Sequence, residues 1–169
     1  MNKLGGVIVA AARCAVAAMA LVALPLHAAV TVSWTDPDLF TDAGDRNNDP
    51  RTVMLSLEQH FKELGDRYLP PQSNLKIQVL DLDRAGRPYR NLPTEIRIIT
   101  GRADMPCIEL NYTLETDSKV VQARRERVCD PDYLRRLGPQ YNEHDPLVYE
   151  KRMLDEWFRT RFAKAEPPR

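Results

Sequence analysis

The sequence is poor in glycine, cysteine and histidine, and it has no excess of either charge. Its 169 residues include 7 glycines against 13 prolines, which is typical of a chain with short elements and frequent breaks. Lysine plus arginine and aspartate plus glutamate both number 24, which argues against a nucleic-acid-binding protein because such proteins need a basic surface. With 43% hydrophobic and 28% charged residues, the collagen-like, low-complexity and wholly disordered classes are excluded.

Long hydrophobic runs are also missing, apart from one near the start of the chain. Residues 14–24 are apolar but too few to span a bilayer, and a positively charged start that includes Arg13 precedes them. This pattern predicts a cleaved signal peptide over residues 1–28, ending at Ala28 or, alternatively, at Ala29. Because no second long apolar run follows, we expect a soluble protein of the periplasm or cell exterior, without a transmembrane segment.

The rest of the chain has the hydrophobic patterns of one α+β domain over residues 29–165, followed by a disordered tail at 166–169. The first helix begins after an N-cap, Asp49, with Pro50 at its first position. The order strand, helix, four strands, helix predicts a sandwich of about five mainly antiparallel strands with two helices on one face. The predicted strands span 30–34, 74–82, 94–100, 107–114 and 120–128, and the predicted helices span 50–68 and 146–163.

Two cysteines, Cys107 and Cys129, remain after the predicted cleavage and lie at the open end of a predicted hairpin. An even pair in an oxidising compartment favours a disulfide over a metal site or a catalytic thiol. If residues 117–119 form the loop, Cys107 lies opposite Cys129, and Glu109 lies opposite Arg127. A two-residue loop would instead shift the register by one residue and separate the two cysteines.

Several short motifs together resemble a known family. They are VTVSW with Asp36-Pro37, Phe40-Thr41-Asp42, Leu69-Pro70, Asp81-Leu82-Asp83 with Ala85-Gly86, and YEKRMLDEWF from Tyr149 to Phe158. In combination they resemble a family of small secreted proteobacterial proteins known only as a domain of unknown function. The resemblance implies an extracytoplasmic location, but it supplies no mechanism and no catalytic residues. Arg84 stands where we expect the family to have an aliphatic residue.

Asp81 and Asp83 form the most suggestive pair for chemistry. Carboxylates two positions apart at a strand end project to one side, about 7 Å apart, and could share a divalent ion or hold a substrate water. A calcium loop of the EF-hand type is excluded, because Ala85 replaces an oxygen ligand and Leu92 stands where a glutamate is needed. The favoured alternative is a structural role, in which the pair accepts backbone N–H groups or pairs with an arginine.

Histidine-based catalysis is disfavoured. His60 and His144 are the only histidines after residue 28, and His60 lies opposite the apolar arc of its helix, so we expect it to be exposed to solvent. The sequence contains no nucleophile elbow, zinc-protease helix or glycine loop for phosphate. We therefore expect no cofactor.

Five arginines form a local basic cluster: Arg124, Arg125, Arg127, Arg135 and Arg136. In an envelope protein, such a cluster could contact an anionic lipid headgroup, a phosphorylated glycan or an acidic protein partner. The alternative is that the charges protect an edge strand from aggregation.

The last helix carries two charged residues, Glu150 and Arg161, within its otherwise apolar arc. They lie about 16 Å apart along the helix, so each needs a partner on another element. A buried ionic network with Arg97 is one hypothesis. The sequence as a whole predicts a secreted or periplasmic envelope protein that acts as a noncatalytic binding or interaction module. The alternative is a metal-dependent or carboxylate-based hydrolase that uses Asp81 and Asp83.

Overall fold

The computed structural model describes residues 28–89, 95–135 and 138–163. Residues 1–27 of the predicted signal peptide and the predicted tail at 166–169 lie outside the described residues. The described residues form ten elements, which are β1 (Ala29–Trp34), the 3-10 helix η1 (Pro37–Leu39), α1 (Pro50–Tyr68), β2 (Ser73–Asp83), β3 (Arg87–Tyr89), β4 (Ile96–Ile98), the 3-10 helix η2 (Arg102–Asp104), β5 (Cys107–Thr116), β6 (Lys119–Cys129) and α2 (Val148–Phe162).

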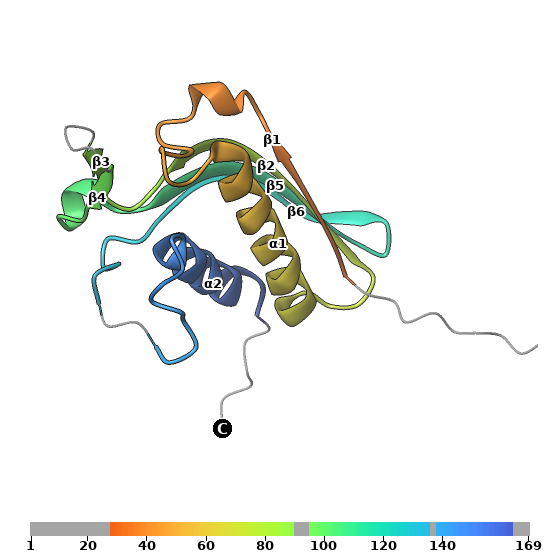
Figure 1. Cartoon of the computed structure of the whole chain (residues 1–169). Helices are drawn as coiled ribbons and strands as arrows, with labels where there is room; N and C mark the ends of the chain where they lie inside the picture. The colour runs from red at the N-terminus through yellow and green to blue at the C-terminus, as the bar shows by residue number, and fades with distance from the viewer. Residues whose placement is uncertain (1–27, 90–94, 136–137, 164–169) are drawn as a thin grey trace, which may run out of the picture.

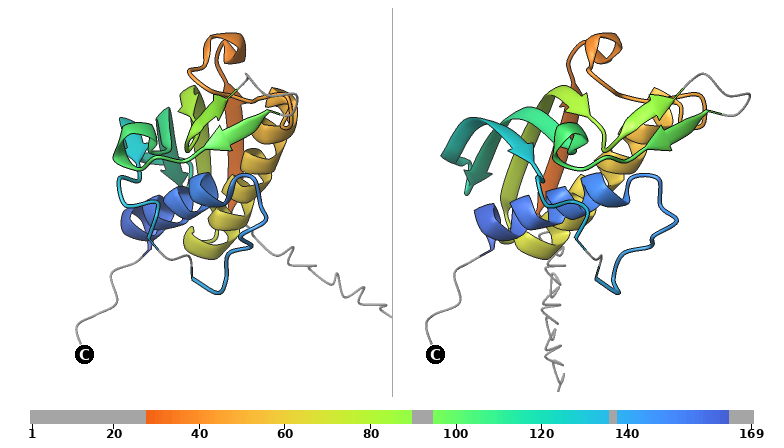
Figure 2. Two further views of the ribbon diagram at one scale, coloured as in Figure 1. Left: turned by 60° about the vertical axis from the view of Figure 1, so that its left-hand side comes forward. Right: turned by 90° about the vertical axis from the view of Figure 1, so that its left-hand side faces the viewer.

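The main sheet has four strands in the order β1-β2-β5-β6 (Figure 1). β1 runs parallel to β2, and the other neighbours are antiparallel. Both helices lie on the same face of this sheet, as the two views of Figure 2 show. The predicted α+β fold is thereby confirmed.

The described part of the strand predicted over residues 94–100 belongs to a separate two-stranded ribbon instead of the main sheet. The central residues of this predicted strand form β4, which pairs with β3 in a small two-stranded sheet. β3 is only three residues long and contains Pro88, so it has neither the alternation nor the composition by which a strand is recognised in a sequence. The main sheet consequently has four strands where about five were expected.

The N-terminus of α1 follows the sequence signals closely. The Asp49 side chain accepts hydrogen bonds from the backbone N–H groups of Arg51 and Thr52, and Pro50 occupies the first turn. The helix ends at Tyr68, before the first of two consecutive prolines. Its apolar arc packs into a core shared with the sheet and α2, and this core includes Leu57, Phe61, Leu75, Ile77, Leu110, Leu154, Trp157 and Phe158.

The β5–β6 hairpin has the predicted register but a different turn. Cys107 lies opposite Cys129, and the two form a disulfide. The turn consists of two residues, Asp117 and Ser118, which both have positive φ, the conformation that a type I′ hairpin turn needs. A bulge beside Leu114 adds one residue on β6 and restores the register that the shorter turn would have shifted.

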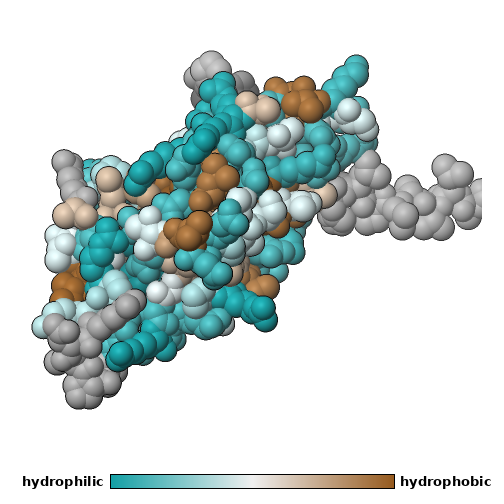
Figure 3. All heavy atoms as spheres, turned by 90° about the horizontal axis from the view of Figure 1, so that it is seen from above, coloured by the Kyte–Doolittle hydropathy of each residue, from teal (hydrophilic) through white to brown (hydrophobic). Residues whose placement is uncertain are grey.

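The sheet face opposite the helices is open and largely hydrophilic. Seen from above in Figure 3, this face is mostly teal, and hydrophobic side chains are confined to small spots. Its side chains come from alternate strand residues such as Thr31, Lys76, Gln78 and Arg125. An antiparallel sheet with one solvated face gives this alternation.

Candidate functional site

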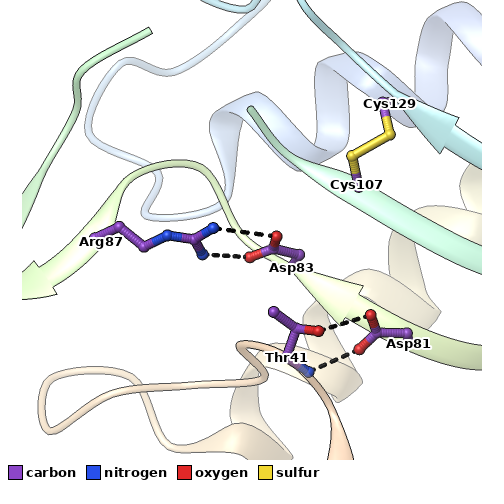
Figure 4. Close-up of a disulfide and its surroundings, with 6 residues drawn as sticks. All are labelled: Thr41, Asp81, Asp83, Arg87, Cys107 and Cys129. Carbon is purple, nitrogen blue, oxygen red and sulfur yellow. Dashed lines mark hydrogen bonds and ion pairs between the residues drawn. A yellow bond between two sulfur atoms is a disulfide. The ribbon is translucent and has the colours of Figure 1, made fainter. Parts of the chain in front are cut away.

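The Asp81 and Asp83 carboxylates both interact with neighbouring parts of the protein (Figure 4). Asp81 accepts hydrogen bonds from the Thr41 backbone N–H at 2.7 Å and from the Thr41 hydroxyl at 2.8 Å. Asp83 pairs with the Arg87 guanidinium at 2.6 Å. These contacts fasten the loop before α1 and the start of β3 to the end of β2. Among the described residues, no group of three or more His, Cys, Asp or Glu side chains is arranged to hold a metal ion.

The three arginines of the predicted cluster that lie on β6 are distributed over two faces of that strand, whereas Arg135 follows β6 and pairs with Asp132 at 4.0 Å. Arg125 and Arg127 lie opposite Asn111 and Glu109 on the open face of the sheet. Arg124 lies opposite the buried Tyr112, so its side chain projects to the helix side. Arg136 lies outside the described residues.

The arginines of β6 also differ in their ion pairs. Arg125 pairs with Glu109 at 2.7 Å. Arg127 and Arg124 are exposed and form no ion pair within the part of the chain that the structure describes. Arg127 is therefore a guanidinium on the open face of the sheet whose hydrogen-bond donors are available to a partner.

A groove of about 880 Å³ runs between β6, α2 and the end of α1, and Arg127 lies among its lining residues. Other arginines of the groove are paired, including Arg161 with Glu126 at 2.9 Å and Arg67 with Asp155 at 3.2 Å. Glu126 also accepts a hydrogen bond from the Trp157 indole N–H at 2.9 Å. These pairs hold α2 against β6 and α1, and they leave Arg127 as the groove arginine that forms no ion pair with a described residue.

A buried ionic cluster joins the acidic loop before α1 to the β3–β4 ribbon. The Arg97 guanidinium bonds to Asp42 at 2.6 Å and to Asp45 at 2.9 Å, and Arg84, only 1% exposed, bonds to Asp45 at 3.2 Å. Burial alone would raise the pKa of Asp45, but hydrogen bonds from Arg97 and Asn48 and the charge of Arg84 hold this pKa below its ordinary value. Two guanidinium groups and two carboxylates thus balance their charges within the domain.

Glu150 lies beside this cluster without joining it directly. Its Oε1 accepts the Ala85 N–H at 2.8 Å, and its Oε2 is buried and has no hydrogen-bond partner among the described residues. Burial raises the pKa of Glu150, although the Ala85 amide and the charges of Arg84 and Arg97 act in the opposite direction. The hypothesis of a network among Glu150, Arg161 and Arg97 is therefore revised: Arg97 bonds to the two aspartates, and Arg161 bonds to Glu126.

The prediction for His60 is wrong. Its side chain is 12% exposed, and Nε2 lies 3.1 Å from the Lys151 carbonyl oxygen of α2. Burial lowers the pKa of His60, and the nearby Asp155 partly offsets this effect. The face of α1 opposite the sheet is covered here by α2, which the periodicity of α1 alone does not reveal.

Comparison with known proteins identifies the family of the chain. A family model described as "Protein of unknown function (DUF3016)" matches residues 28–160. The chain belongs to the DUF3016 family. No curated protein and no solved structure matches it.

The family confirms the resemblance seen in the sequence motifs, and those motifs occupy structural positions in this DUF3016 domain. VTVSW forms most of β1, and YEKRMLDEWF lies within α2. The DLD motif forms the end of β2, where Asp81 bonds to Thr41 and Asp83 bonds to Arg87. Within residues 28–89, 95–135 and 138–163, no helix has the length and apolar character to cross a bilayer.

Proposed function

We propose that this DUF3016 protein is an exported, noncatalytic binding module of the cell envelope, and that β6 receives an acidic segment of another envelope protein. The observation that carries the proposal is Arg127. Its guanidinium is exposed on β6, beside Arg125 and at the rim of the groove, and it forms no ion pair with a described residue. An anion that binds there does not have to displace an internal carboxylate.

The proposed location is supported by the Cys107–Cys129 disulfide, since such bonds persist in oxidising compartments. Fractionation of cells that express the full chain tests it. We expect the protein in the periplasmic or extracellular fraction, with Ala29 or Val30 as its first residue. A cytoplasmic protein that retains residues 1–28 would contradict the proposal.

Binding is tested with a fluorescent polyglutamate probe at several salt concentrations. We expect saturable binding that weakens as salt rises, because exposed charges carry the contact. Arg127→Gln should weaken it, whereas the matched variant Arg124→Gln removes the same charge from the other face of β6 and should have little effect. Stronger binding to phosphatidylglycerol vesicles or to glucose 1-phosphate would instead identify a lipid headgroup or a phosphorylated glycan. Equal effects of the two variants would overturn the assignment to Arg127.

A further inference from the structure

β6 is an outer strand of the main sheet, and one of its sides is open. All of its 11 residues except the bulged Val121 pair with β5, and no other described strand pairs with it. In the right-hand view of Figure 2, β6 lies at the rim of the sheet, while the helices lie on the face. Such an edge presents backbone N–H and C=O groups that can pair with another extended chain.

The pairing of β5 with β6 determines which residues present these groups. In antiparallel strands, hydrogen-bonded pairs alternate with closer pairs that are not hydrogen-bonded. The Cα atoms of Cys107 and Cys129 are 4.2 Å apart, as in a pair without hydrogen bonds, and the adjacent Asp130 N–H bonds to the Pro106 carbonyl at 3.2 Å. Counting back in steps of two, the residues whose backbone groups point away from β5 are Ala123, Arg125 and Arg127.

The same residues direct their side chains to the open face of the sheet. A residue placed directly opposite one of them on an added strand would project to that face as well, with its Cβ about 4.5–5.5 Å away. Arg127 forms no ion pair with a described residue, and the Arg125 side chain is 66% exposed although its Nε and Nη2 bond to Glu109. The complementary residues opposite both positions are therefore acidic. Backbone pairing and charge pairing therefore select the same two positions of β6.

We infer that an extended acidic segment of the partner adds to β6 as a fifth strand, with two carboxylates two positions apart opposite Arg125 and Arg127. This inference rests on the proposed function and specifies how the segment binds. A second copy of this chain is a poorer occupant, because pairing two β6 strands about Arg125 places arginines directly opposite one another, which is destabilising.

The test compares two synthetic peptides on the oxidised protein. One is a capped octapeptide of alternating threonine and glutamate, and the other is the same peptide N-methylated at the backbone amides that would face β6. We expect the first to shift the amide resonances of Ala123, Arg125 and Arg127 and to slow their exchange with solvent. The N-methylated peptide should bind about tenfold more weakly, because it cannot complete the ladder.

Each outcome decides between the two proposals. Equal binding of both peptides would show that charge alone holds them, which overturns strand addition and leaves the proposed function intact. Binding of neither peptide would overturn both. Self-association with concentration, accompanied by shifts of the same three resonances, would identify a second copy as the occupant and overturn the inference.

A variant of the protein gives an independent measurement. Ala123→Pro removes one outward-facing N–H, and proline is tolerated on the open side of an edge strand. We expect weaker binding of the unmodified peptide with an unchanged Tm, whereas Arg124→Gln should leave the binding unchanged. Unweakened binding to a folded Ala123→Pro protein would contradict strand addition. If this variant does not fold, the peptide comparison on the unaltered protein still decides.

Discussion

Replacing Arg97 with methionine should destabilise the protein strongly, because its guanidinium neutralises two buried carboxylates. The Arg97 side chain is 16% exposed, and those of Asp42 and Asp45 are 7% and 4% exposed. Arg97 also donates to the carbonyl groups of Ala85 and Gly86 at 3.2 and 3.1 Å. Methionine keeps most of the side-chain volume, so the variant removes the charge and the hydrogen bonds with little loss of packing.

The expected loss follows from what remains. Asp45 keeps its bond to Arg84. Asp42 loses both of its hydrogen bonds to a cationic side chain, because Arg97 donates both. Removing one partner of a buried ion pair costs about 3–5 kcal/mol, because the other charge stays buried and uncompensated. We therefore expect Arg97→Met to lower the free energy of unfolding by about 3–5 kcal/mol.

Urea unfolding followed by tryptophan fluorescence measures this loss, with linear extrapolation to water. Arg51→Met is the matched control, since Arg51 lies exposed on α1, and its free energy of unfolding should change by less than about 0.5 kcal/mol. The cost of Arg97→Met should shrink in acid once Asp45, whose pKa lies below its ordinary value, becomes protonated. A loss below about 1 kcal/mol at pH 7 would refute the assignment of Arg97 as the residue that neutralises this cluster.

Three further measurements test the buried acid, the disulfide and the DLD motif. Burial raises the pKa of Glu150 above its ordinary value of 4.5. As the pH rises above 4.5, the free energy of unfolding of the unaltered protein should therefore fall relative to that of Glu150→Gln, by up to about 1.4 kcal/mol per pH unit. The fall should stop once the carboxyl ionises in the folded state. Unfolding measured from pH 4 to pH 8 checks this, and a pH-independent difference contradicts it. Reducing the Cys107–Cys129 bond, which spans 22 residues, should lower the free energy of unfolding by about 3 kcal/mol in urea titrations with and without dithiothreitol. Asp81→Asn should cost about 1–3 kcal/mol through its contacts with Thr41 and leave calorimetric titrations with Mg²⁺ or Ca²⁺ unchanged; loss of a metal-binding signal in a stable variant would favour the hydrolase hypothesis.

Local signals determined the helices, the strands of the main sheet and the hairpin register. Asp49 and Pro50 begin α1 because a capping side chain and a preset φ act within one turn of the chain. The Cys107–Cys129 pair could be placed because both residues lie on strands joined by a short turn. The sequence left a two-residue turn open as an alternative, but it did not reveal the bulge several residues away that restores the register.

Tertiary structure alone decided the partners of charged residues that come from distant segments. The periodicity of α1 indicates which of its faces meets the sheet, but it does not show that α2 also covers His60. Arg97, Asp42 and Asp45 come from segments more than 50 residues apart, and only the packing of the ribbon against the acidic loop brings them together. Backbone hydrogen bonding and hydrophobic alternation repeat along each helix and strand, so these elements can be predicted from neighbouring residues in the sequence. An ion pair needs only two side chains to meet, and the fold alone determines which two.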